Sequence, residues 1–249
     1  MFHTVRLVRH VQDEAARHRD YAALMSDSPP GAVDLLGVLA YAELTAFLKL
    51  AEDAAALAPS LTDRAALSDL AVAEYGHFEL LRDRLAALGQ DPEAAMAPFV
   101  APLDDWHAQT KPGDWLEALV KAYVGTGIAG DFYREAARQA EPETRKLVDE
   151  VLAEESRSEF AVERVRAALA ENPKDAGRLA LWARRLVGEA LSQAHRLAAT
   201  RPELALLLVA GGAVDGTSDA GQIGIGRLFS RLTEEHGKRM SALGLVPGP

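Results

Sequence analysis

Hydrophobic residues along most of the chain recur at alternating intervals of three and four, which is the spacing of one helix face. Stretches rich in Pro, Gly, Ser or Asp separate these segments and end them. No segment keeps the strict alternation that is typical of a β-strand, so we predict an all-α protein. We expect helices over 34–53, 62–88, 114–140, 143–170, 178–200 and 221–243, and a short one that starts at 202.

The order of the first four expected helices restricts the fold. Helices joined by a short turn form antiparallel neighbours, whereas the Pro-rich link 90–113 is long enough to run the length of a bundle. Two pairs joined by a long crossover predict a ferritin-like four-helix bundle, here followed by additional C-terminal helices. A generic helical bundle is the alternative. We divide the chain into an N-terminal extension, 1–30, and a ferritin-like domain, 31–249, whose core bundle spans about 33–170 and whose C-terminal helices span about 177–243.

Three ionisable residues occupy positions where the helical pattern calls for buried apolar side chains. Glu43 falls on the apolar stripe of the first helix, and Glu74 and His77 fall on that of the second helix. Burying an unpaired charge costs several kcal/mol, so these groups need a common compensating partner. A divalent cation bound by carboxylate oxygen and imidazole nitrogen is one such partner, and a buried hydrogen-bonded network is the alternative.

The third and fourth helices offer further carboxylates. Asp131 lies in register with the apolar positions of the third helix, and Glu135 is a rival one turn later. In the fourth helix Glu154 and Glu155 lie on either side of the apolar centre, and the pattern does not separate them.

A ferritin-like di-iron site takes one carboxylate from each of two helices and a Glu-x-x-His pair from each of the other two. Glu43 and Asp131 can fill the single positions, and the Glu74 pair is complete. The second pair begins at Glu154, but Arg157 stands where its histidine is expected, and a guanidinium cannot bind a metal ion.

Arg157 therefore predicts at most one tightly held iron, on the side of Glu43, Glu74 and His77. Alternatively, Arg157 neutralises the carboxylates as an internal cation, or His195 replaces the missing ligand. We expect His107 to be solvated and His236 to lie on the surface.

Amino-acid composition restricts the metal ligands, the partners and the location that we expect. The chain has no cysteine, which excludes disulfides, thiolate zinc sites and iron–sulfur clusters and leaves carboxylates and imidazoles as metal ligands. The net charge of −10 disfavours indiscriminate nucleic-acid binding. We see neither a signal peptide nor an apolar run of the roughly 20 residues that a membrane span needs, so we expect a cytoplasmic protein without a membrane partner.

Several motifs together resemble the ferritin-like tRNA hydroxylases of the MiaE type, in their actinobacterial branch, from about residue 34 to the C-terminus. They are "LAYAELTAF", "AEYGHFELLRDRLAALG", "YVGTGIAGDFYREA", "VLAEESRSEFAVERVRAAL" and "LWARRLVGEALSQAHR". The resemblance implies an O₂-dependent di-iron monooxygenase that hydroxylates the isopentenyl group of a modified adenosine in tRNA. It maps the metal-ligand positions onto Glu43, Glu74, His77, Asp131 and Glu154.

This activity implies tRNA as a partner. It also implies an electron-donor protein, because the chain has no dinucleotide-binding glycine motif of its own. Five arginines form either a tRNA-facing strip or an ordinary solvated face: Arg178, Arg184, Arg185, Arg196 and Arg201. Two alternatives stay open, a ferritin-like binding or structural module with an incomplete metal site and a peroxide-handling metal protein. Homodimerisation stays open as well.

Overall fold

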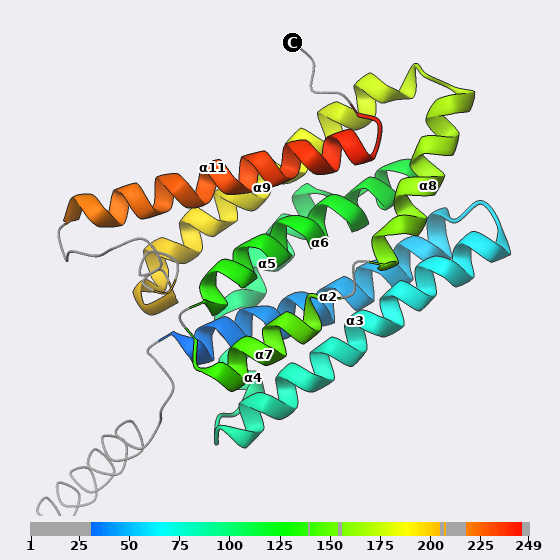
Figure 1. Ribbon diagram of the computed structural model, residues 1–249. Coiled ribbons are helices and arrows are strands. Elements are labelled where there is room, and N and C mark those ends of the chain that lie inside the picture. The colour runs from blue at the N-terminus through cyan, green and yellow to red at the C-terminus, as the bar shows by residue number, and fades with distance from the viewer. Residues whose placement is uncertain (1–30, 139, 154–155, 205–206, 208–217, 246–249) are drawn as a thin grey trace, which may run out of the picture.

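The computed structural model of the chain describes residues 31–138, 140–153, 156–204, 207 and 218–245, without the side chains of 156–158 and 218–229. The expected N-terminal extension, 1–30, lies outside the described residues. Within the described ranges the chain is helical and contains no strand, so the predicted all-α class is confirmed (Figure 1). The helices are α2 (Ala32–Leu57), α3 (Leu61–Ala87), α4 (Pro92–Met96), the 3₁₀ turn η1 (Ala97–Phe99), α5 (Val100–Gln109), α6 (Trp115–Ala137), α7 (Pro142–Val151), α8 (Ser156–Glu171), α9 (Asp175–Thr200) and α11 (Ser218–Ala242).

Helices α2 and α3 form an antiparallel pair with a tight turn between them (Figure 1). Ser60 caps α3, because its side-chain oxygen accepts a hydrogen bond from the Asp63 amide at 3.0 Å. Gly89 follows the end of α3 with a φ of 72°, a conformation that favours glycine, and so stops the helix as expected. This hairpin positions the candidate site, since Glu43 lies on one of its arms and Glu74 and His77 on the other.

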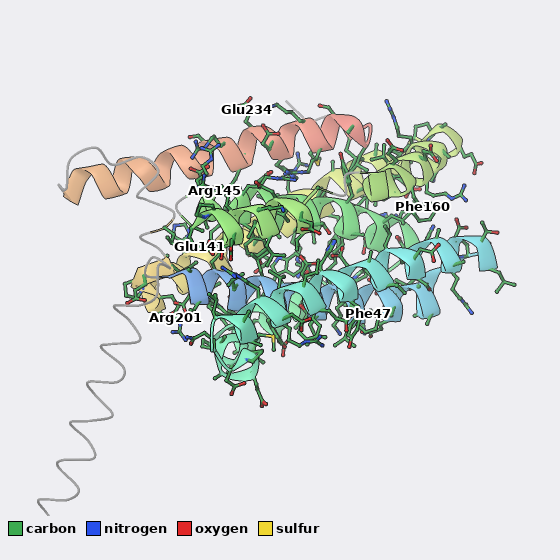
Figure 2. All side chains as sticks on the ribbon, turned by 60° about the horizontal axis from the view of Figure 1, so that its bottom comes forward. Phe47, Glu141, Arg145, Phe160, Arg201 and Glu234 are labelled. Carbon is green, nitrogen blue, oxygen red and sulfur yellow. The ribbon has the colours of Figure 1, made fainter. Side chains whose placement is uncertain are left out.

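Helix α6 runs in the same direction as α3, which is the arrangement that a long crossover produces. At one end Leu67 of α3 lies in the same apolar cluster as Trp115 of α6. At the other end Arg84 of α3 forms an ion pair with Glu141, just beyond α6, at 2.7 Å. Figure 2 labels Glu141 at this end of the bundle. The starts of both helices are therefore together, and so are their ends, which confirms the predicted crossover topology.

The crossover itself differs from the prediction, because it is helical rather than an irregular connection. Pro92 occupies the first turn of α4, where a missing backbone N–H costs nothing, so proline here starts a helix instead of breaking one. Helix α5 then runs back beside α2, where Tyr41 donates a hydrogen bond to Asp104 at 2.8 Å. Trp106 fixes the other side of α5 by donating to the Leu186 carbonyl of α9 at 3.4 Å.

The predicted single helix over 143–170 is also wrong, because two helices, α7 and α8, share this range and change direction between them (Figure 1). The sequence between Val151 and Ser156 contains neither Pro nor Gly. Instead, Arg134 of α6 donates to the Leu152 carbonyl at 2.9 Å. A side chain from a neighbouring helix thus satisfies a carbonyl that continued helix would otherwise use.

The C-terminal helices α9 and α11 lie side by side and cover α5 and α6 on the face opposite α2 and α3 (Figure 1). Trp182 ties α9 to α6 by donating to the Glu117 carbonyl at 3.0 Å. The short helix expected at 202 begins there, and its continuation lies outside the described residues. No described helix is both long and apolar enough to cross a membrane.

Candidate metal centre

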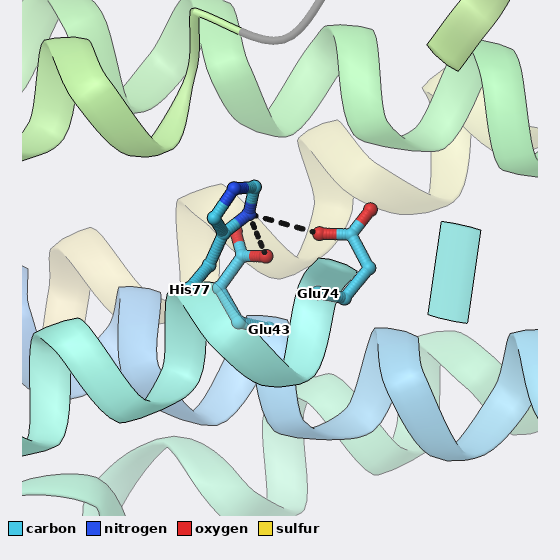
Figure 3. Close-up of side chains that lie close together, drawn as sticks. All are labelled: Glu43, Glu74 and His77. Atoms are coloured by element: carbon cyan, nitrogen blue, oxygen red, sulfur yellow. Dashed lines mark hydrogen bonds and ion pairs between the residues drawn. The ribbon is translucent and has the colours of Figure 1, made fainter. Parts of the chain in front are cut away.

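Glu43, Glu74 and His77 meet inside the α2–α3 hairpin, and each is only 8% exposed (Figure 3). Nδ1 of His77 lies 3.3 Å from Oε2 of Glu43 and 3.4 Å from Oε2 of Glu74. One ligand atom from each residue lies within 4.8 Å of the other two, so the three are within reach of one ion. The predicted convergence of these residues is therefore observed.

Local geometry explains this convergence. Glu74 and His77 are three residues apart, which places both side chains on one face of α3, one turn from each other. The tight turn after α2 brings Glu43 opposite that face. Leu39, Leu81 and other fully buried residues above and below the group hold the two backbones in register.

Burial and the neighbouring charges together shift the pKa values of Glu43 and His77. Burial and the neighbouring Glu74 charge raise the pKa of the Glu43 carboxyl well above its ordinary value. Burial by itself lowers the pKa of His77, but hydrogen bonds to Glu43 and Glu74 outweigh it and raise the pKa to about 9. In the metal-free protein a proton thus holds the three residues together.

The donor set fits one divalent cation. Two carboxylates outweigh a single imidazolium, so the group still lacks positive charge when His77 is protonated. Carboxylate oxygen and imidazole nitrogen are ligands for iron, manganese and zinc, and a bound ion would displace the shared proton.

Asp131 is not part of this group. It lines the same cavity of about 480 Å³ as the three residues, but its carboxylate is paired with Arg239 of α11 and with Arg134 at 3.6 Å. Arg239 also donates to the Gly127 carbonyl at 2.9 Å. Its rival Glu135 is paired as well, with Arg231 at 2.6 Å.

Gly127 explains how a long side chain from α11 reaches Asp131. A Cβ atom at this position would lie 2.1 Å from Nε of Arg239, so only glycine leaves room for the guanidinium. The space beside this glycine is therefore occupied by a side chain from a neighbouring helix. Sequence reasoning missed Arg239, which lies more than a hundred residues from its partner.

The remaining expected site residues take no described part in the group. The side chains of Glu154, Glu155 and Arg157 lie outside the described residues. His195 is exposed, and its Nδ1 lies 2.9 Å from the Leu191 carbonyl of its own helix.

Two other histidines contradict the expectations for them. His236 was expected on the surface, yet it is buried, and neither ring nitrogen has a hydrogen-bond partner among the described residues. His107 was expected to be solvated, yet burial and the charges of Lys121 and Lys49 lower its pKa to about 3. Both positions are fixed by helices that pack from far along the chain.

A second cavity, of about 190 Å³, touches the candidate centre from the side of α5 and α9. Its lining is mostly apolar and includes Leu103, Ile128 and Leu191. Glu43 and Glu74 line both cavities. An ion held by these carboxylates would therefore lie at the boundary between a polar space and an apolar one.

Comparison with known proteins agrees with this architecture. No curated protein matches the chain. A family model described as the ferritin-like domain of actinomycetes matches residues 29–211, which is more than half of the chain. The crossed-over bundle and the match together show that the chain belongs to this ferritin-like domain family.

Proposed function

We propose that this protein is a metal-dependent oxygenase that binds one iron ion through Glu43, Glu74 and His77 and oxidises an apolar group. The observation that carries the proposal is the position of the two carboxylates, which are buried, converge on one imidazole and also line an apolar cavity. A purely structural network has no need of a cavity beside it.

Each part of the site has a separate role. Glu43 and Glu74 supply the negative charge that holds a cation, and His77 supplies a nitrogen ligand after it loses its proton. When bound, iron supplies activation of O₂ and the oxidising power for attack on an unactivated C–H bond. The apolar walls position the substrate and exclude water.

The pairing of Asp131 supports a single metal ion rather than two. A second ion on the α6 side would need the Asp131 carboxylate, which Arg239 and Arg134 already neutralise. A fixed positive charge there also repels a cation.

The finer assignment, hydroxylation of an isopentenyl group on tRNA with an electron-donor protein, rests on the resemblance to the MiaE-type hydroxylases. An isopentenyl group is apolar, as the smaller cavity requires. The expected arginine strip supports tRNA less well. Arg178 pairs with Glu117 at 2.7 Å and Arg201 with Asp34 at 3.6 Å, so both are engaged within the chain.

The Arg239–Asp131 pair also supports a second candidate function, a ferritin-like binding or structural module. In that case the buried carboxylates share protons and hold no metal. Metal content separates the two candidates directly.

The decisive experiment strips the protein with a chelator, restores Fe(II) without oxygen, and measures iron per chain after desalting. We expect one iron per chain, and O₂ uptake with a chemical reductant that exceeds the uptake of iron-free protein. His77→Ala should lose both, whereas Glu79→Gln, on the exposed face of the same helix, should retain both. Iron near zero in the wild-type protein would establish the structural module, and two irons per chain would overturn the role of Arg239.

A further inference from the structure

The smaller cavity carries charge in an otherwise apolar lining. Lys121 of α6, Lys49 and Asp53 of α2, and His107 of α5 line it together with the apolar residues. Glu43 and Asp53 are ten residues apart on α2, which corresponds to about 15 Å along a helix. The cavity is therefore elongated, with the candidate metal centre towards one end of it.

Lys121 is an unusually buried cation. It is only 7% exposed, and its ammonium donates to the Thr110 carbonyl at 2.7 Å and lies 4.9 Å from the centre of the Trp106 ring. An ammonium has three donors, and in the described part of the chain this is its one hydrogen bond. No described carboxylate lies within ion-pair distance of it, although the Asp53 charge acts on it from further away.

Two further polar atoms in the same lining have no hydrogen-bond partner in the part of the chain that the structure describes. Oε1 of Gln193, a residue that is 7% exposed, and Nδ1 of His107 are buried without a hydrogen bond in the described structure. Buried polar atoms are rarely left in this state, because each costs free energy that a partner would recover. A bound carboxylate would supply an acceptor for an N–H at Nδ1 of His107, whereas the Gln193 oxygen needs a donor from another group.

We propose that this cavity binds an elongated apolar molecule that carries one carboxylate, with the carboxylate at Lys121 and His107 and the apolar chain directed towards Glu43 and Glu74. As a statement about the substrate, this inference rests on the proposed oxygenase function and replaces the isopentenyl substrate that the family resemblance implies. The binding itself requires no metal.

The charges around Lys121 favour a polar end of the bound molecule that carries a single negative charge. A monoanion completes the unused donors of Lys121 and can pair with the neutral His107 ring. A phosphate carries more negative charge, which Asp53 beside the lysines disfavours. An amine would be repelled by Lys121 and Lys49.

Calorimetric titration of chelator-treated protein tests the inference, with octanoate, octanol and octylamine as probes of equal chain length. We expect octanoate to bind at least tenfold more tightly than octanol and octylamine. Hexanoate should bind roughly tenfold more weakly than octanoate, because each buried methylene contributes a several-fold factor.

Variants of Lys121 separate the charge from the fold. Lys121→Gln keeps a donor for the Thr110 carbonyl and should weaken octanoate about tenfold without changing octanol. Lys121→Arg keeps the positive charge and should retain the octanoate affinity that Lys121→Gln loses. Lys146→Gln, at an exposed position, should leave octanoate affinity unchanged.

Three results would overturn the inference: equal affinities for octanoate and octanol, octanoate binding that Lys121→Gln does not change, or tighter binding of isopentenyladenosine that is insensitive to Lys121. The last result would assign the cavity to a nucleoside. Because all titrations use metal-free protein, their failure is independent of iron content and O₂ uptake, which test the proposed function separately.

Discussion

The two walls of the larger cavity treat buried carboxylates in opposite ways. On the α2–α3 wall Glu43 and Glu74 share one histidine, so their charge is offset only in part, and by a proton that can leave. On the α6 wall Asp131 is held by the guanidinium of Arg239, which stays charged at every accessible pH. Both walls face one space of about 480 Å³.

Burial of an acidic residue is therefore not enough to indicate a metal ligand. A carboxylate whose partner is an arginine is already neutralised, and a cation gains little by approaching it. A carboxylate whose partner is a histidine can exchange its proton for a metal ion. If this distinction holds, variants of the two walls should differ in iron content and in stability.

The largest effect should come from removing the nitrogen ligand. His77→Ala should lower iron affinity by more than about 100-fold, since loss of a group outside the ligand shell already costs about 10–100-fold. Iron is measured per chain by elemental analysis after dialysis against a weak chelator. Retention of wild-type iron content by this variant would remove the α2–α3 wall from metal binding.

The stability of metal-free protein should depend on pH through His77. The folded protein keeps the His77 proton up to a pKa of about 9, whereas the unfolded chain releases it near 6.5. The stabilisation is therefore complete below pH 6.5 and is lost as the pH rises to about 9, by roughly 3 kcal/mol. Urea unfolding across this range measures the loss, and His77→Gln should flatten the slope; an equally steep slope in the variant would point to another group.

Arg239→Gln should make the Asp131 carboxylate on the α6 wall more available to a metal ion, as Glu43 and Glu74 are on the α2–α3 wall. Loss of this partner leaves the partly buried Asp131 with Arg134, at 3.6 Å, as its remaining ion-pair partner, so stability should fall by roughly 1–2 kcal/mol after allowance for its exposure. Iron content should rise above one per chain.

The control for this variant is Arg231→Gln. Arg231 lies on the same helix as Arg239 but forms its ion pair with Glu135 rather than with Asp131. Gly127→Ala offers a second route, since the added Cβ must displace the guanidinium. An iron content of one per chain in both Arg239→Gln and Gly127→Ala would show that the arginine does not limit metal binding.

The smallest effect should be a gain in stability. Glu43→Gln removes a carboxyl whose pKa is raised by burial and by Glu74, so metal-free protein at neutral pH should become about 1 kcal/mol more stable. The same variant should bind iron more weakly. A loss of stability in the metal-free variant would mean that the Glu43–His77 contact contributes more than the burial costs.

Several features of the fold and site could be predicted because they depend on short stretches of chain. The three-residue spacing of Glu74 and His77 places them together on any helix, and the apolar residues around them show that this face is buried. The length of the link 90–113 was enough to predict the crossover, although its own helices were missed.

Other features could not be predicted because they depend on partners distant in the chain. Nothing near Arg239 indicates that it enters the bundle, and nothing near His236 indicates that its side chain is buried. The break between α7 and α8 occurs without Pro or Gly, where Arg134 takes the Leu152 carbonyl.

The helices and their buried faces follow from the amino-acid sequence alone, because backbone geometry repeats every few residues and apolar side chains must leave water. The same pattern is enough to place Glu43, Glu74 and His77 in one interior. Which buried carboxylate keeps an exchangeable proton, and which receives an arginine, follows instead from the folded arrangement. That choice depends on side chains brought together from distant helices, and the energy of such a contact depends on distances and burial that no local pattern contains.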